Sequence, residues 1–293
     1  MDAATGDDVG SPDDAGTVAD GSQDAETDTG ADTGTTDDAA QDAGTDAGVD
    51  AGPSWWRPAA GTSWQIQLQG TLSTNVDVEV YDIDLFDTDQ SVINKLKADG
   101  RKVICYFSAG SYEDWRPDKA KFQKSDYGKP LDNWPGEWWL DVRSQNVRII
   151  MADRMDIAVQ KKCDAVDPDN VDGYQNDTGF PLTAADQQDY LEFLADAAHA
   201  RGLAVGLKNC LGLVTKVVSR FEFQVNEECL AYNECRDLKP FINADKPVFH
   251  IEYVNQTSEG PARKAEVCGD PTIAGFSTLI KTWDLDAWRL TCD

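Results

Sequence analysis

The chain has 293 residues and a net charge of −27, from 53 acidic and 26 basic side chains. Fifteen of the acidic residues and none of the basic ones lie in residues 1–52, so residues 53–293 carry only −12, with 38 acidic side chains against 26 basic ones. This acidic balance argues against nucleic acid or an anionic membrane as partner, and no run of 18 apolar residues predicts a membrane span.

Residues 1–52 consist almost wholly of Asp, Ala, Gly, Thr, Ser and Val, in near-repeats such as "DAGTDAGVDAG". Such a composition buries too little apolar surface to offset the entropy of ordering, so we expect a disordered linker. Met1-Asp2 opens directly into it, and no signal peptide is visible. A long linker before an enzyme-sized domain is typical of a tether. We therefore expect a secreted or surface-tethered protein whose signal segment was trimmed or lies upstream.

Residues 53–293 are enough for one α/β barrel or two smaller domains. Eight short segments rich in β-branched or aromatic residues are predicted to be strands. They are Trp64–Gln69, Val78–Ile83, Lys102–Ser108, Asp164–Asp169, Leu203–Asn209, Phe221–Asn226, Pro247–Tyr253 and Ala274–Lys281.

Helical patterns lie between several of these strands. Thr88 can cap a helix that ends at Gly100, and Thr183 with Asp186 resembles a capping box. Further helices are expected over Ser144–Gln160 and Gly212–Ser219. This alternation predicts an α/β fold, a (β/α)8 barrel over residues 53–293. A doubly wound open sheet is the alternative, but no Gly-rich phosphate loop follows any strand.

A barrel places its functional groups at the carboxyl ends of the strands and in the loops that follow. Polar residues do gather there. They are Asp82 and Asp84, Ser108, then Asp167, Asp169 and Asp172, then Lys208 and Asn209, Asn226, Glu227 and Glu228, Glu252 and Tyr253, Lys281 and Asp284.

The loops at this end also carry tryptophans. "NWPGEWWLD" follows the third strand with Trp134, Trp138 and Trp139, and Trp115 precedes it. These indoles predict a stacking platform for sugar rings, with Trp283 added after the last strand. The alternative is that they cover the barrel mouth against the helices.

An aromatic, carboxylate-rich cleft suits glycoside hydrolysis, which needs one carboxylic acid and one carboxylate. Other chemistries fit less well. His199 lies in a helix tail and His250 on an apolar strand, so no zinc site is expected, and no G-x-S-x-G elbow occurs. "DPDNVDG" superficially resembles a calcium loop but lacks the Gly at position 6 and the Glu at position 12. We expect no metal and no cofactor.

The cysteines are mildly in favour of an oxidising compartment. Cys229 with Cys235, and Cys268 with Cys292, are spaced for two possible disulfides. Cys105, Cys163 and Cys210 sit in apolar strand-like contexts and are expected to be buried free thiols.

Five segments in order, "CYFSAGSYEDWRPD", "DAVDPDNVDGYQNDTGF", "GLAVGLKN", "VNEECLAYNEC" and "PVFHIEY", together resemble glycoside hydrolase family 114. This is the endo-α-1,4-polygalactosaminidase family of TIM barrels, and the resemblance covers nearly all of residues 60–290. It implies internal cleavage of α-1,4-linked galactosamine polymers, the partly deacetylated exopolysaccharides of microbial biofilms. It also implies catalytic carboxylates after the fourth and sixth strands, which fall on Asp169 and Glu227.

Asp169 is one of several aspartates in its segment. Strand alternation puts Asp167 and Asp169 on one side. More distant relatives resemble "D-G-V-F-L-D-T-V-D", in which Asp167 falls on an apolar residue while Asp164, Asp169 and Asp172 keep their match. Asp169 is therefore the expected nucleophile or stabiliser, Asp164 a strand-start cap and Asp172 a residue that orders the turn.

Glu227 has a rival in the next residue, Glu228, which is expected to point elsewhere. Asp82 and Glu252 would suit a cationic amino sugar, or form barrel-mouth salt bridges with Lys208 or Arg116. The expected substrate contacts are Asp82, Tyr106, Ser108, Trp138, Asp167, Asp172, Lys208, Asn209, Asn226, Glu252 and Trp283.

The sequence thus predicts a monomeric, endo-acting and preferably retaining glycoside hydrolase. The alternatives are a non-catalytic sugar-binding barrel that uses the same cleft, and a hydrolase for another α-linked sugar.

Overall fold

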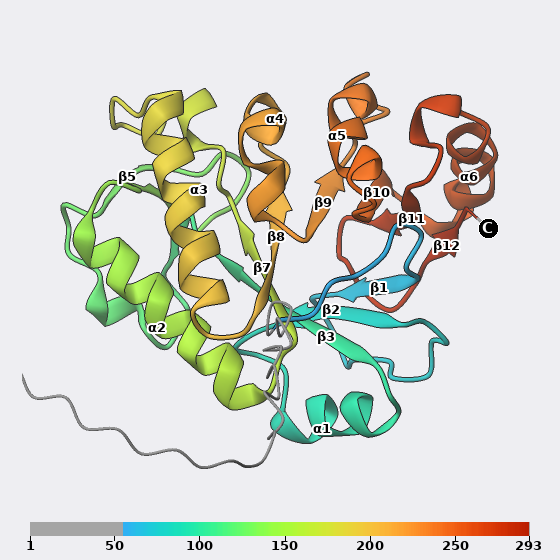
Figure 1. Ribbon diagram of the computed structural model, residues 1–293, viewed down its shortest axis with the longest axis horizontal. Helices are drawn as coiled ribbons and strands as arrows, with labels where there is room; N and C mark the ends of the chain where they lie inside the picture. The colour runs from blue at the N-terminus through green and yellow to red at the C-terminus, as the bar shows by residue number, and fades with distance from the viewer. Residues whose placement is uncertain (1–54, 293) are drawn as a thin grey trace, which may run out of the picture. The chain divides into compact units, whose positions relative to one another are not determined.

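The computed structural model describes residues 55–292, so the expected linker over residues 1–52 lies outside the described residues. Eight parallel strands form a curled sheet in which each strand pairs with the next along the chain, the order of a (β/α)8 barrel (Figure 1). They are β1 (Trp64–Gln67), β2 (Val80–Asp84), β3 (Lys102–Ser108), β7 (Ala165–Asp169), β8 (Ala204–Lys208), β9 (Phe223–Glu227), β10 (Val248–Val254) and β11 (Ser277–Thr282). All eight predicted strands are confirmed, with ends that differ by up to three residues.

Helices cover the outer face of this sheet (Figure 1). They are α1 (Gln90–Ala98), α2 (Gln145–Lys161), α3 (Ala184–His199), α4 (Val214–Val217), α5 (Lys239–Asn243) and α6 (Gly260–Cys268). A loop follows β1, and a short antiparallel strand, β12 (Leu290–Thr291), follows β11. No helix in the described part of the chain combines the length and apolar character that a bilayer crossing needs.

The helix starts agree with the sequence at two of three predicted caps. Thr183 and Asp186 form the expected capping box at the start of α3, and the Ser144 hydroxyl accepts a hydrogen bond from the Val147 amide at the start of α2. The predicted cap at Thr88 is wrong, because the residue before α1 is Asp89 and its side chain makes no capping hydrogen bond.

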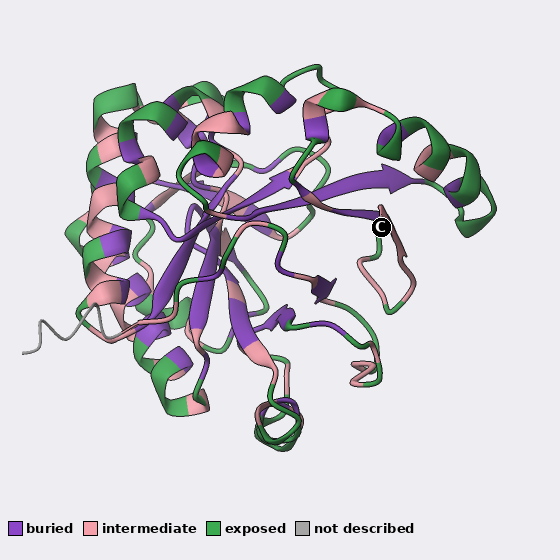
Figure 2. Ribbon diagram, turned by 45° about the vertical axis from the view of Figure 1, so that its right-hand side comes forward, coloured by how far each residue is buried: buried purple, intermediate pink, exposed green. Residues whose placement is uncertain are grey.

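Every strand of the barrel is buried on both sides (Figure 2). Alternate residues such as Ile66, Val80, Ile104 and Phe249 fill the barrel interior. The intervening residues pack under the helices in a second apolar cluster. A polar side chain near a strand end therefore faces either the barrel mouth or the helix layer, according to its parity along the strand.

The two ends of the curled sheet meet without a strand ladder among the described residues. Instead the Trp64 indole donates to the Ser277 carbonyl at 2.8 Å, and the Ser277 hydroxyl donates to the Thr62 carbonyl at 2.7 Å. The amide of Leu68 donates to the Leu285 carbonyl at 3.0 Å. These contacts close the barrel between β1 and β11.

A three-stranded antiparallel sheet is inserted between β3 and α2, in the order β4–β6–β5. Its strands are β4 (Ser111–Glu113), β5 (Tyr127–Pro130) and β6 (Glu137–Leu140). The sequence predicted a tryptophan-rich loop here, so this small sheet is an addition to the expected barrel.

Three disulfides join Cys229 to Cys235, Cys268 to Cys292, and Cys105 to Cys163. The first two were predicted. The prediction of free thiols holds for buried Cys210 and is wrong for Cys105 and Cys163. Because β3 and β7 are neighbours in the sheet, Cys105 and the residue just before β7 lie with their Cα atoms 6.0 Å apart, a spacing that a disulfide can span.

Candidate active site

A cleft of about 960 Å³ opens at the carboxyl ends of the barrel strands. Residues from the ends of β2, β3, β7, β8, β9 and β10 form its floor, the β4–β6 insertion forms one wall, and the segment after β11 forms another. Seven of the thirteen predicted site residues line it. They are Tyr106, Asp169, Asp172, Lys208, Asn209, Glu227 and Trp283.

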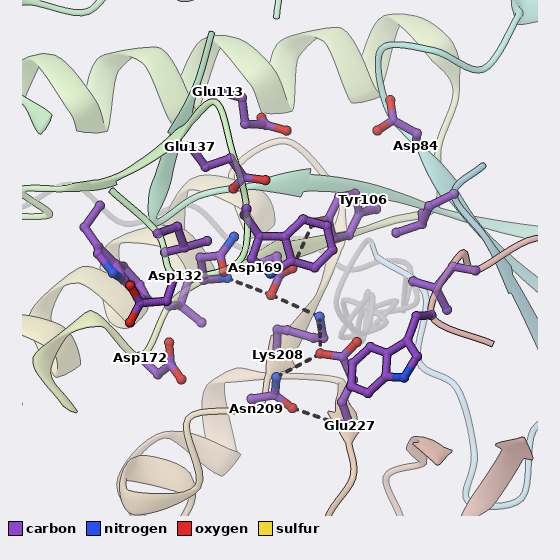
Figure 3. A pocket seen from close by; sticks show the side chains of 18 of the residues that line it. Asp84, Tyr106, Glu113, Asp132, Glu137, Asp169, Asp172, Lys208, Asn209 and Glu227 are labelled. Carbon is purple, nitrogen blue, oxygen red and sulfur yellow. Dashed lines mark hydrogen bonds and ion pairs between the residues drawn. The ribbon is translucent and has the colours of Figure 1, made fainter. Parts of the chain in front are cut away.

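Lys208 stands at the centre of the floor between two carboxylates (Figure 3). Its Nζ atom lies 3.0 Å from Asp169 Oδ1 and 3.0 Å from Glu227 Oε2, so those two oxygens are at most 6.0 Å apart. Parallel neighbouring strands β7, β8 and β9 produce this arrangement, because each ends at the same rim of the barrel with an inward-facing side chain.

Each carboxylate is also held by neutral donors. The Tyr106 hydroxyl donates to Asp169 Oδ2 at 2.8 Å, and the Asn170 amide donates to Asp169 Oδ1 at 2.7 Å. The Asn209 side chain donates to Glu227 Oε2 at 3.1 Å, and the Tyr253 hydroxyl donates to Glu227 Oε1. The two groups are therefore fixed in orientation and in position.

The ionic state of Lys208 follows from its neighbours. Its side chain is 4% exposed, and this burial lowers its pKa, but the charges of Asp169, Glu227 and Asp167 outweigh burial and raise the pKa well above the usual value. Lys208 is therefore a fixed ammonium that neutralises charge on the cleft floor.

Asp82 and Asp167 lie below this floor, in the barrel interior, and do not line the cleft. Both are fully buried, and none of their carboxyl oxygens has a hydrogen-bond partner among the described residues. Burial raises the pKa of Asp167 to about 7 and that of Asp82 well above its usual value, so a proton is held at this pair near neutral pH. The predicted salt bridge of Asp82 is not formed, whereas Asp84 pairs with Arg116 at 2.7 Å.

Four other predicted contacts face away from the cleft. Glu252 and Asn226 have the outward parity on their strands. Glu252 pairs with Arg263 at 2.6 Å, rather than with the predicted Lys208 or Arg116, and accepts a hydrogen bond from the Leu230 amide. Ser108 is buried beneath the insertion.

Trp138 is the fourth. It packs on Tyr112 and Tyr127 because β6 is a strand, so its neighbours Glu137 and Trp139 take the opposite face and line the cleft.

Glu228 departs from its expectation in the other direction. Its backbone φ of +59° turns the chain after β9, and its side chain lines the cleft beside Glu227. Burial raises the pKa of Glu228, and the nearby charge of Glu252 adds to the effect. Asp172 also lines the cleft, and burial together with the charge of Asp169 raises its pKa to about 6.

The sequence missed the polar residues that the insertion contributes. Arg116 joins Asp84 at 2.7 Å and Glu113 at 2.8 Å, and all three line the cleft with Glu137 and Asp132. Alternation in "SYE" and "EWWL" was the available signal, and it required recognising these short segments as strands.

Charge is strongly asymmetric in the cleft. Eleven carboxylates and three basic side chains line it among the described residues. The three basic groups are already paired: Arg116 with Asp84 and Glu113, Lys129 with Asp177, and Lys208 with the central pair. The cleft therefore has a net negative charge that favours cationic ligands.

Aromatic rings stand on both sides of the central carboxylates. Trp115 and Trp134 from the insertion are about half exposed, as is Trp283 on the far side. Trp283 stacks on Tyr253, the donor to Glu227, with 4.2 Å between ring centroids. Exposed indoles of this kind offer flat apolar faces to sugar rings.

The described residues contain one cluster with the spacing of metal ligands, Cys229, Cys235 and His250. It lies in the core, and its two cysteines are joined in a disulfide, so it offers no thiolate. His250 is a buried core residue, as predicted, with its ring nitrogens facing Thr278 and Glu252.

Comparison with known proteins bears on this geometry. The model of glycoside-hydrolase family GH114 matches residues 45–293. The chain belongs to this family. It is similar to Ega3 of Aspergillus fumigatus, solved in complex with galactosamine, with 52% identity and a TM-score of 0.78 over 81% of this chain and 97% of that one. The GH114 chain is thus a glycoside hydrolase with a barrel fold.

A more distant structure shares the fold. The glycoside hydrolase domain of PelA from Pseudomonas aeruginosa aligns with a TM-score of 0.61 at 12% identity, over 80% of this chain and 99% of that one. A search of the curated proteins gave no match.

Proposed function

We propose that this hydrolase cleaves α-1,4-linked galactosamine-containing polysaccharide at internal bonds, with Asp169 and Glu227 as the catalytic pair. The observation that carries the proposal is the acidic cleft built around these two carboxylates. A polymer of amino sugars is cationic, so the excess of carboxylates attracts it. The similar Ega3 was solved with galactosamine, which supports the same class of sugar.

Asp169 is proposed as the nucleophile. Its carboxylate receives hydrogen bonds from Tyr106 and the Asn170 amide and an ion pair from Lys208, all of which favour the ionised form. Glu227 protonates the leaving oxygen while Asp169 bonds to the anomeric carbon. A water molecule then attacks the glycosyl-enzyme with Glu227 as base, and Asp169 is released.

Lys208 has a defined part in this cycle. In the first step the negative charge of Asp169 is consumed by the new covalent bond, and a negative charge forms on Glu227 as its proton leaves. The ammonium group is 3.0 Å from both carboxylates and so neutralises one of them before and after the transfer. Preorganised charge of this kind stabilises the transition state.

The spacing supports retention of anomeric configuration. The facing oxygens of Asp169 and Glu227 are at most 6.0 Å apart. Retaining enzymes have their two carboxyl groups about 5–5.5 Å apart, whereas inverting enzymes need about 6.5–9.5 Å to admit a water molecule. The tryptophans on both sides of the pair support binding of sugar units on each side of the cleaved bond, as endo-action requires.

We also propose that the protein works outside the cell as a monomer. Three disulfides within the described residues support an oxidising compartment. All the residues that line the cleft come from one chain, so the site is complete without a second copy.

The test uses defined oligomers of galactosamine and of N-acetylgalactosamine, with products followed by mass spectrometry. Wild-type protein should release internal fragments from the galactosamine series. D169N and E227Q should each lose this activity while E192Q, a matched change on the outer helix α3, keeps it. Full activity in D169N or E227Q would refute the assigned pair, and binding without any product would indicate a non-catalytic sugar-binding barrel.

A further inference from the structure

We propose that Glu137 is the residue that recognises the ammonium group of a galactosamine unit bound beside Asp169, and that it gives the enzyme its preference for deacetylated sugar. The inference deepens the proposed function and rests on it. Glu137 begins β6, and its side chain faces the cleft on the same strand face as Trp139 (Figure 3).

Glu137 is a buried carboxylate without a cation. The residue is 7% exposed, and its one hydrogen bond among the described residues comes from the Ser111 hydroxyl, at 2.6 Å to Oε2. No lysine or arginine of the described chain forms an ion pair with it, and its second oxygen is left to the cleft. Burying a carboxylate in this way is unfavourable unless a positive charge completes the site.

The neighbouring strand supplies an internal comparison. Glu113 on β4 is the register partner of Glu137 and is also buried, at 3% exposed. Glu113 has two arginine partners, Arg116 at 2.8 Å and Arg154 at 3.5 Å. Two adjacent glutamates on one face therefore differ in one respect: the protein neutralises Glu113 itself and leaves Glu137 to be neutralised by something in the cleft.

The position of Glu137 fits a sugar next to the catalytic floor. Ser111, which donates to Glu137, is 3.5 Å from the Asn170 side chain, and the Asn170 amide donates to Asp169. This short chain of contacts fixes Glu137 beside the proposed nucleophile. Trp139 lines the cleft two residues along the same strand and can contact the apolar face of the ring.

An organic cation fits better than a metal ion. The described residues place only Cys229, Cys235 and His250 within the mutual reach of metal ligands, so Glu137 belongs to no such group. A single carboxylate oxygen beside an indole is suited to an ammonium group on a carbohydrate. An acetamido group carries no charge and cannot replace it.

The burial of Glu137 agrees with this assignment. Burial raises its pKa to about 7, and the charges of Glu113 and Asp169 act in the same direction. The Ser111 hydrogen bond and the charge of Arg116 oppose the shift without cancelling it. A substrate ammonium would restore the ionised form by supplying the missing positive charge.

The experiment compares E137Q, E137D and the matched outer-helix control E192Q by kcat/KM on galactosamine and N-acetylgalactosamine oligomers of equal length. E137Q should fold, because a glutamine carbonyl can still accept the Ser111 hydrogen bond. We expect it to lose about 10- to 100-fold on galactosamine oligomers, the size of a lost hydrogen bond between charged groups, and little on acetylated oligomers. E137D, which keeps the charge, should lose less, and E192Q should match wild type.

Two outcomes would overturn the assignment: wild-type kcat/KM of E137Q on galactosamine oligomers, or equal losses on both series. If E137Q does not fold, E137D decides, because withdrawing the carboxylate by one methylene should reduce the preference for galactosamine, and an unchanged preference refutes the role. A wild-type protein that cleaves neither series would instead refute the proposed function. Calorimetric binding of galactosamine to wild type and to E137Q still tests the ammonium site in that case, and equal affinity would overturn it.

Discussion

Replacing Lys208 with methionine removes the positive charge between Asp169 and Glu227 and nearly preserves side-chain volume. The two facing oxygens are at most 6.0 Å apart, since each is 3.0 Å from Nζ. At an effective dielectric constant of about 20, two unit charges at this distance repel by about 3 kcal/mol. Ionising both carboxylates then requires a pH about two units higher, at 1.36 kcal/mol per unit.

The assay is the pH dependence of kcat/KM on galactosamine oligomers. The acid limb of K208M should move upward by about two pH units, and its activity near neutral pH should fall by about 100-fold. K208R keeps the charge and should leave the acid limb near its wild-type position. An unshifted limb in K208M would refute the idea that Lys208 sets the charge of the catalytic pair.

Three further predictions concern stability and binding. Burial raises the pKa of Asp167 from its usual value near 4 to about 7, so the folded state holds a proton that the unfolded state releases, and stability is lost as pH rises through this window. In urea unfolding, D167N should therefore gain up to about 4 kcal/mol relative to wild type between pH 4 and pH 8, and a constant difference would contradict the assignment. The Cys105–Cys163 disulfide closes a 58-residue separation, so C105S/C163S should lose roughly 4 kcal/mol of unfolding free energy against roughly 2 kcal/mol for the six-residue Cys229–Cys235 bridge; equal losses would argue against the loop-entropy account. W283A removes the ring stacked on Tyr253 and should raise KM about 3- to 10-fold with kcat little changed, whereas an unchanged KM would exclude Trp283 from the sugar site.

The barrel could be predicted from sequence because its strands are short, doubly buried apolar runs with polar residues at one end. Asp169, Lys208 and Glu227 follow from the same logic, since the ends of neighbouring parallel strands share one rim. Parity along the strand separates contacts from neighbours. Glu252 shares the outward parity of His250, and this explains why it pairs with Arg263 in the helix layer instead of lining the cleft.

Other features depend on pairings that no local pattern encodes. Cys105 and Cys163 look like buried thiols in their own segments and meet only because β3 and β7 are adjacent. The β4–β6 insertion has strands of three and four residues among Gly, Pro and Trp, a composition typical of loops. Its fold was needed to see that Glu137, and not Trp138, faces the cleft.

The most direct test of the central claim is the anomeric configuration of the first product. Purified protein is mixed with a defined α-1,4-linked galactosamine oligomer, and the new reducing end is followed by time-resolved proton NMR before mutarotation. The spacing of Asp169 and Glu227 predicts that the α anomer forms first. A product that forms first as the β anomer would contradict the retaining pair, and the absence of hydrolysis would contradict the proposed substrate.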